Sequence, residues 1–150
     1  MDYDLSKRPP RRWSDSVDGI VWLPRFIDKA HAYDAGTLGI YVFGQSPTDA
    51  SFLQTAGVGY AQFLECVRSA ADDAGVLSNI EGAAPGATAR LRTWSANPPA
   101  IVRLTYGIVD GDEGYAKGFP SIVRLIPKPV FAGLIRLWRR VAPLRLRDVG

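Results

Sequence analysis

The chain has 150 residues, of which 47% are apolar and 22% are charged. This length can bury the core of one domain, and the composition excludes a wholly disordered chain. The formal net charge is only +3, and Cys66 is the single cysteine, which excludes an intrachain disulfide and a cysteine-based zinc site.

The sequence predicts no membrane span. Its longest apolar region, residues 119–138, is interrupted by Arg124, Lys128 and Arg136, whereas a spanning helix needs about 20 mostly apolar residues. The N-terminal residues are basic but have no apolar run behind them, which argues against a secretory signal. We therefore expect a cytoplasmic protein of a bacterium-like cell.

Residues 1–19 are predicted to form an extended basic arm, because Pro9 and Pro10 oppose helix formation. The first helix should begin at Leu23 or Pro24, since proline is favoured in the first helical turn, and Gly36 should end it. On a helical wheel one side is apolar and the other is charged. The apolar side holds Leu23, Phe26, Ile27, Ala30 and Tyr33, and the charged side holds Arg25, Asp28 and Lys29.

Residues 37–43 (TLGIYVF) could form a short strand or a buried extended connection, and the absence of an obvious partner strand favours the connection. A second helix should follow, with Ser46 as its N-cap, Pro47 as its first residue and Asp49 in its first turn. This helix should stop at Gly57.

Further helices are predicted over residues 60–70, 72–80 and 87–95. The next begins after Asn97-Pro98-Pro99, and we expect Ile101, Leu104 and Ile108 to face the core. Its β-branched content leaves helix or strand open for residues 100–109. Residues 110–119 read as a glycine-rich acidic loop, and a last helix should start at Pro129.

The predicted fold class is therefore mainly α: one compact multi-helix domain over residues 20–150, with one short extended segment at about 37–43. The GAAPG break offers an alternative division into lobes, residues 20–81 and 87–142.

Four segments between residues 20 and 80 occur in a recognisable order: WLPRFIDKAHA, GTLGIYVFG, SPTDASFLQTAGVGYAQF and DDAGVLSNI. Together they resemble a bacterial family catalogued as domain of unknown function “fifty sixty-nine”. The matching positions are Leu23, Pro24, Arg25, Asp28, Lys29, Gly36, Gly39, Tyr41, Phe43, Asp49 and Phe63. Many members carry Asn-Cys after the aromatic segment, where this chain has Gly44-Gln45-Ser46. The resemblance informs the fold and implies no activity.

Arg25, Asp28 and Lys29 lie at i, i+3 and i+4, so Asp28 could pair with Arg25 on a solvated face, for about 0.2–0.5 kcal/mol. The functional interpretation is an anion- or partner-binding face. Because Tyr41 and other aromatic residues lie near Arg25 in the sequence, we predict a pocket for a small anion or carboxylate, either binding or catalytic, within residues 22–49. Its predicted residues are Arg25, Asp28, Lys29, Tyr41 and Asp49.

A second functional class is an accessory module that binds a protein, nucleic acid or anionic surface. It would use the basic arm and the arginine-rich C-terminal region, which includes Arg136, Arg139 and Arg140. Such charge clusters are more often simply solvated.

Three other patterns favour simpler explanations. Asp28 and His31 could contribute to a metal site, but a lone histidine beside an apolar face is usually structural, so no cofactor is predicted. Cys66 with His31 could form a nucleophile and base, yet burial of the thiol explains the cysteine better. The acidic run from Asp110 to Gly114 lacks the final acidic ligand of a calcium loop.

Overall fold

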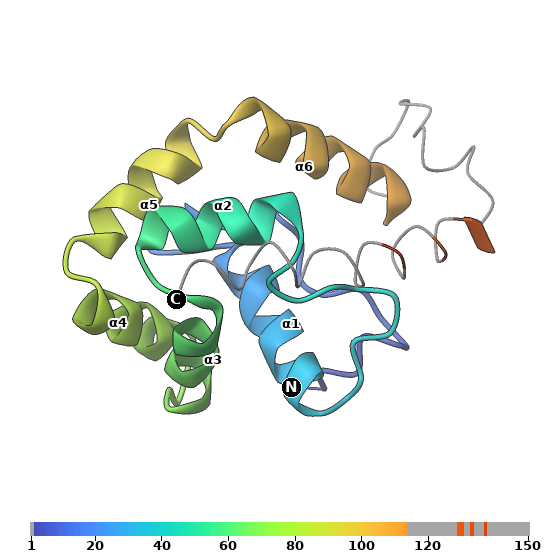
Figure 1. The fold of residues 1–150 in the computed structure, drawn as a ribbon, viewed down its shortest axis with the longest axis horizontal. Coiled ribbons are helices and arrows are strands. Elements are labelled where there is room, and N and C mark those ends of the chain that lie inside the picture. The colour runs from blue at the N-terminus through green and yellow to red at the C-terminus, as the bar shows by residue number, and fades with distance from the viewer. Residues whose placement is uncertain (1, 114–128, 131–132, 134–136, 138–150) are drawn as a thin grey trace.

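The computed structural model describes residues 2–113 together with residues 129–130, 133 and 137. In this part of the chain six helices follow one small hairpin, which confirms the mainly α prediction (Figure 1). The elements are β1 (Ser16–Val17), β2 (Ile20–Val21), α1 (Leu23–Asp34), α2 (Pro47–Ala56), α3 (Tyr60–Arg68), α4 (Asp73–Ala83), α5 (Ala87–Ala96) and α6 (Ala100–Asp112).

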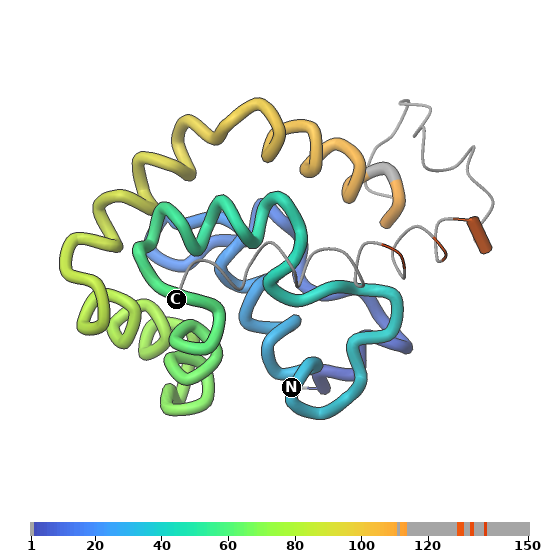
Figure 2. Tube along the Cα trace, viewed as in Figure 1, coloured from blue at the N-terminus to red at the C-terminus, as the bar shows by residue number. Residues whose placement is uncertain are grey.

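Helix α1 lies among the other elements. α3 packs against α1 and α4, while α2 packs against α5 and α6, which follow one another in an arc (Figure 1). The N-terminal arm runs beside the loop between α1 and α2, as Figure 2 shows, and Thr37 Oγ1 donates a hydrogen bond to the Tyr3 carbonyl at 3.3 Å. Among the residues described, no helix has the length and apolar content to cross a membrane.

The ends of α2 agree with the sequence prediction because their chemistry is local. Ser46 has an extended backbone, and its hydroxyl accepts a hydrogen bond from the Asp49 N–H at 3.1 Å, as an N-cap should. Gly57 ends the helix at φ +78°, a left-handed conformation that glycine adopts without steric cost.

The hairpin was not predicted within the arm. Asp18 and Gly19 connect its strands with φ values of +52° and +75°, the left-handed pair of a tight hairpin turn. Asp-Gly is a strong local signal for this turn, but strands of two residues are too short to show an alternating pattern.

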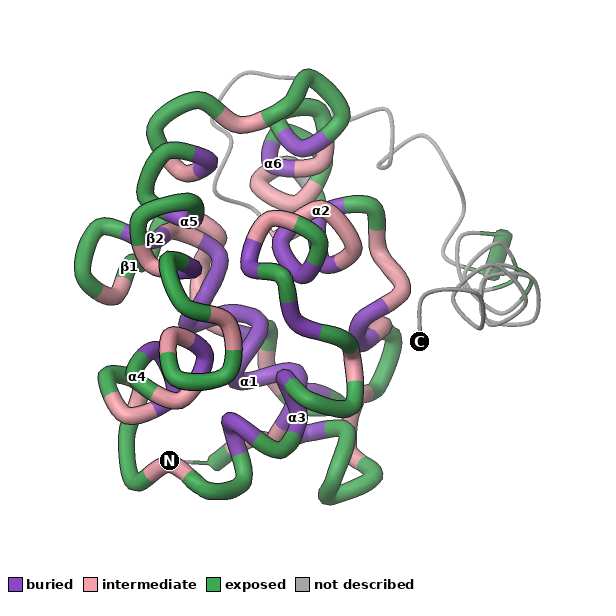
Figure 3. The backbone as a smooth tube through the Cα atoms, turned by 60° about the vertical axis from the view of Figure 1, so that its left-hand side comes forward, coloured by how far each residue is buried: buried purple, intermediate pink, exposed green. Residues whose placement is uncertain are grey.

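Aromatic rings form the centre of the core. Phe26 on α1 is fully buried and stacks on Phe63 of α3, with 4.1 Å between ring centroids. The rings of Phe43 and Phe52 also pack against Phe26, with centroid separations of 5.2 and 5.6 Å. Figure 3 shows the buried residues gathered on α1 and its neighbours. The same core includes residues on both sides of the 82–86 break, such as Ile80 and Leu91.

Helix α6 corrects two predictions. It is helical through Asp112, so residues 110–112 do not belong to a loop. Its core-facing residues are Val102 and Tyr106, whereas Ile101, Leu104 and Ile108 are 52%, 60% and 38% exposed. The helix has two apolar stripes, and its own periodicity does not determine which of them meets the core. The predicted last helix lies almost entirely outside the described residues.

Candidate functional site

The charged side of α1 is buried, which makes the prediction of a solvated face wrong. Arg25 and Lys29 are each 3% exposed, and Asp28 is fully buried. The N-terminal arm, the start of α2 and the end of α6 contribute partners for these side chains. A helical wheel cannot show that segments distant in sequence cover a polar side.

Asp28 pairs with Arg11 of the arm, so the predicted pairing of Asp28 with Arg25 is also wrong. The Arg11 backbone N–H donates to Asp28 Oδ2 at 2.8 Å, and its Nε donates to Oδ1 at 3.0 Å. The Arg11 guanidinium also pairs with Asp73 of α4. Burial acts to lower the pKa of Arg11, but the bonds to Asp73 and Asp28 outweigh it and raise the pKa. Asp28 therefore fastens the arm to α1 and, through Arg11, to α4.

Lys29 pairs with Asp49 in the interior. Its Nζ lies 2.6 Å from both carboxylate oxygens, while Trp22 Nε1 donates to Oδ1 at 2.8 Å and the Gly44 N–H donates to Oδ2 at 2.9 Å. Burial lowers the pKa of Lys29, and the charge of Asp49 acts in the opposite direction. The sequence prediction named both residues as ligand contacts, and the structure joins them to each other.

Arg25 holds a carboxylate that the sequence analysis missed, that of Glu113. Its Nη2 lies 2.6 Å from Oε1 and its Nη1 lies 3.1 Å from Oε2, and the Glu113 side chain is only 4% exposed. The Arg25 Cζ lies 5.4 Å from the Trp22 ring centroid and 5.5 Å from that of Tyr41, within cation–π range. Glu113 is distant in sequence, and its local pattern suggested only an acidic loop.

Tyr41 contacts the same pair from the loop. Its hydroxyl donates to Glu113 Oε1 at 3.4 Å. Burial, followed by the charge of Glu113, raises the pKa of Tyr41, so the phenol remains a donor at neutral pH.

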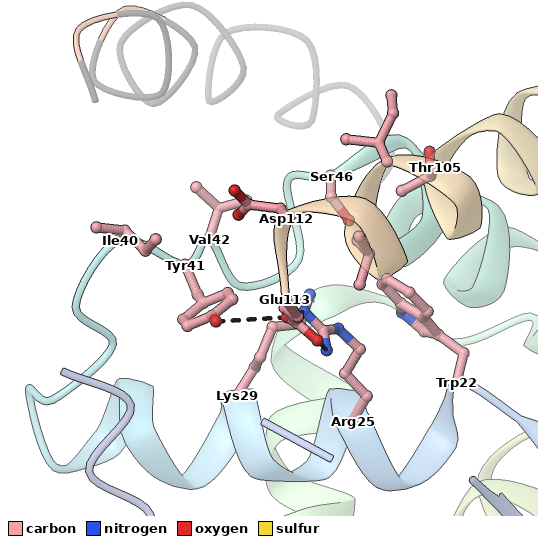
Figure 4. A pocket seen from close by; sticks show the side chains of 12 residues that line it. Trp22, Arg25, Lys29, Ile40, Tyr41, Val42, Ser46, Thr105, Asp112 and Glu113 are labelled. Carbon is pink, nitrogen blue, oxygen red and sulfur yellow. Dashed lines mark hydrogen bonds and ion pairs between the residues drawn. The ribbon is translucent and has the colours of Figure 1, made fainter. Parts of the chain in front are cut away.

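A pocket of about 190 Å³ opens beside this pair. Figure 4 shows Arg25 and Lys29 rising from α1, Tyr41 approaching from the loop, and Glu113 at the end of α6. Of the predicted residues, Arg25, Lys29 and Tyr41 line the pocket. Asp49 does not line it but is bonded to Lys29, and Asp28 is paired with Arg11 instead. The lining residues are Trp22, Arg25, Lys29, Ile40, Tyr41, Val42, Ser46, Thr105, Ile108, Val109, Asp112 and Glu113.

His31 and Cys66 lie outside this pocket. The His31 ring stacks on Tyr3 with 4.2 Å between centroids, and burial lowers its pKa. Asp28, its suggested metal-ligand partner, is engaged with Arg11, and the described residues contain no group of three or more His, Cys, Asp or Glu that could hold a metal ion. Cys66 is buried, and burial raises the pKa of its thiol.

The cations of the basic arm are all engaged by other groups of the protein: Lys7 and Arg8 within the arm, and Arg11 and Arg12 with the helices. Lys7 pairs with Asp4, and Arg12 pairs with Asp110 at 3.0 Å. Arg8 donates to the Asp2 carbonyl, and Arg11 pairs with Asp28 and Asp73. Arg136, Arg139 and Arg140, the other cations of the predicted interaction surface, lie outside the described residues.

Comparison with known proteins identifies a family. Neither the curated proteins nor the solved structures gave a match. A family described as Domain of unknown function (DUF5069) matches residues 7–99, which is more than half of the chain. The match includes Arg11, Arg25, Lys29 and Asp49, and it ends before α6 and Glu113. The chain belongs to the DUF5069 family, in agreement with the resemblance noted over residues 20–80.

Proposed function

We propose that the pocket binds a small molecule that combines a carboxylate, or a similar anionic group, with an apolar body about the size of an aromatic ring. The observation that carries this proposal is the Arg25–Glu113 pair. In that pair a buried guanidinium at the pocket already holds a carboxylate through two nitrogens. The contacts support binding and assign no reaction.

Arg25 has the geometry that carboxylate recognition requires. A planar guanidinium forms two parallel bonds with a carboxylate, which gives orientation as well as energy. The rings of Trp22 and Tyr41 lie within cation–π distance of the guanidinium. Arg25 Nε has no hydrogen-bond partner among the described residues, which leaves one donor of the guanidinium unsatisfied by this part of the chain.

The size and walls of the pocket favour an apolar body on the ligand. Ile40, Val42, Ile108 and Val109 contribute apolar side chains, and Trp22 adds an aromatic face. An apolar cavity of about 150 Å³ can hold benzene. A volume of about 190 Å³ therefore accommodates one ring with a small polar substituent.

Trp22 adds an independent indication. This bulky residue has φ +70° at the N-terminus of α1, in the left-handed region that side chains with a Cβ rarely adopt. Its position is held by the indole bond to Asp49 and by a backbone bond from its N–H to the Trp13 carbonyl at 2.9 Å. Strained backbone of this kind is concentrated at functional sites.

The test is a titration with benzoate and phenylacetate, with benzamide as the uncharged counterpart of benzoate. NMR of the Trp22 indole N–H reports binding inside the pocket, and thermal unfolding reports stabilisation by a ligand of the folded state. We expect both carboxylates to shift the indole resonance and raise Tm, and benzamide to do so far less. Equal responses to benzoate and benzamide, or no response to any carboxylate, would overturn the proposal.

Two variants locate the binding. Arg25→Gln should abolish carboxylate binding, while Arg92→Gln removes a surface arginine paired with Asp18 and should leave binding unchanged. If Arg25→Gln does not fold, Ile108→Trp provides the alternative, because it fills the pocket from the partly exposed side of α6 and leaves the ion pairs in place. Unchanged benzoate binding in Ile108→Trp would place the site elsewhere.

A further inference from the structure

Among the residues that the structure describes, the buried charges beside the pocket are balanced before any ligand binds. Arg25 and Lys29 contribute two positive charges, and Glu113 and Asp49 contribute two negative ones, with every side chain at most 4% exposed. A ligand anion added to this set would leave one buried negative charge without a counterion. A buried charge without a counterion is strongly unfavourable even after the protein relaxes. A carboxylate that binds Arg25 must therefore take the place of one already present.

Glu113 is the carboxylate that can leave. Asp49 lies in the first turn of α2 and accepts bonds from Lys29, Trp22 and Gly44, so its removal would disrupt the interior. Glu113 directly follows α6, and its bonds to the described residues outside the helix are those with Arg25 and Tyr41. Helix ends open locally at small cost in free energy compared with core elements.

The position of Glu113 is unfavourable for a carboxylate by local criteria. The C-terminal end of a helix carries partial negative charge and favours cations. Here the last residues of α6 already include Asp112, and Asp110, which is paired with Arg12. The helix end thus repels the Glu113 charge, and the contact with Arg25 holds it in the pocket. This combination makes the side chain a displaceable occupant.

We propose that Glu113 is a built-in competitor, whose carboxylate occupies the anion position on Arg25 and moves to solvent when a ligand carboxylate binds. The inference rests on the proposed function and adds its regulation. The exchange keeps Arg25 paired and the buried charge unchanged, so neither state contains an isolated ion. The free protein would then be largely in the occupied state, and the pocket would bind only ligands that outcompete the end of α6.

Removal of the Glu113 carboxylate distinguishes a competitor from a residue that contacts the bound ligand, because the two roles predict opposite changes in ligand affinity. If Glu113 helped to hold the ligand, its removal would weaken binding. If it competes, its removal lowers the apparent Kd. The factor is the inverse of the fraction of wild-type molecules in which the site is open. Since such minor states are populated to about 10% or less, Glu113→Gln should lower the benzoate Kd at least about tenfold.

The experiment compares benzoate titrations of the wild type, Glu113→Gln, Glu113→Asp and Glu65→Gln by the Trp22 indole resonance. Glu113→Asp keeps the charge but shortens the side chain, so it should also tighten binding, by a smaller factor, and it decides the test if Glu113→Gln fails to fold. Glu65→Gln removes the same charge from an exposed site on α3 and should leave the Kd within about twofold, as for surface changes away from a site.

The outcomes separate the two proposals. If the wild type binds benzoate and the Glu113 variants bind it no more tightly, the competitor is refuted while the anion pocket stands. If neither the wild type nor any folded Glu113 variant binds benzoate, the proposed function itself fails. Equal tightening in Glu65→Gln would attribute the effect to net charge and would also refute the competitor.

Discussion

Replacing Lys29 with methionine should destabilise the fold by about 3–5 kcal/mol, the cost of leaving a buried ion without its partner. Asp49 is fully buried and accepts bonds from Lys29, from the Trp22 indole and from the Gly44 N–H. In Lys29→Met the two short bonds from Nζ are lost. The remaining donors carry no charge, so they cannot neutralise the carboxylate.

Asp49→Asn should cost a similar amount, because it leaves the Lys29 ammonium in the interior without an anion. The double variant Lys29→Met/Asp49→Asn removes both charges and keeps an amide oxygen that can accept from Trp22 or Gly44. It should therefore cost at least about 2 kcal/mol less than the sum of the single variants, within the coupling range of contacting residues.

The assay is urea denaturation near neutral pH, followed by far-UV circular dichroism, with the m-value checked for each variant. Arg92→Ala, which breaks a half-exposed pair with Asp18, serves as the control and should cost at most about 1 kcal/mol. The buried pair would be refuted if either single variant lowered the free energy of unfolding by less than about 1 kcal/mol. It would also be refuted if the losses of the two single variants simply summed to that of the double variant.

Three further predictions concern the core, the arm and the thiol. Phe26→Ala should lower the free energy of unfolding by about 3–5 kcal/mol, because the Phe26 ring contacts three other phenylalanines. Urea denaturation measures this loss, and a loss below about 1 kcal/mol would contradict the central packing of Phe26. Gly39→Ala should be clearly more destabilising than Gly36→Ala in the same assay. Both glycines have positive φ, but a Cβ on Gly39 would lie 2.8 Å from the Leu5 carbonyl oxygen, whereas one on Gly36 meets nothing within 4 Å. Equal effects would mean that the arm does not lie beside Gly39. The Cys66 thiol should react with Ellman's reagent much more slowly in the native protein than in urea, because burial shields the sulfur. The pH midpoint of the native reaction should lie above the ordinary thiol pKa, because burial also disfavours the thiolate. A fast reaction of the native protein would refute the burial of Cys66.

The sequence predicted those parts of the fold that depend on neighbouring residues. The cap of α2 requires only that Ser46 precede Pro47 and Asp49, and its end requires only Gly57. Most helices could be placed in the same way, since a turn of helix is determined by its own residues. The two stripes of α6 show the limit, because the choice of the buried stripe depends on where α2 lies.

The candidate site was predicted as a set of residues but not as a set of contacts. Arg25, Lys29 and Tyr41 could be selected because they lie close together in the sequence beside aromatic residues. Their partners could not: Arg25 meets Glu113 across 88 residues, and Asp28 meets Arg11 across 17. Ion pairs of this span leave no periodic signal, so a single sequence does not reveal them.

The three buried charges of α1 each hold a different part of the chain. Asp28 holds the arm through Arg11, Lys29 holds the start of α2 through Asp49, and Arg25 holds the end of α6 through Glu113. Buried ion pairs contribute little net stability compared with apolar contacts, yet each is costly to break. They therefore specify where these segments attach to α1.

These attachments differ in how they can open. Asp28 also accepts a bond from the backbone N–H of Arg11 in the arm, and Asp49 accepts one from the N–H of Gly44 in the loop before α2, so neither pair can separate without loss of local structure. The Arg25–Glu113 pair joins two side chains at a pocket, and one of them comes from a helix end. It is therefore the attachment on α1 that the proposed exchange with a ligand carboxylate would open. Loss of Arg11 or Asp49 should accordingly lower stability first, whereas loss of Glu113 should change ligand affinity first.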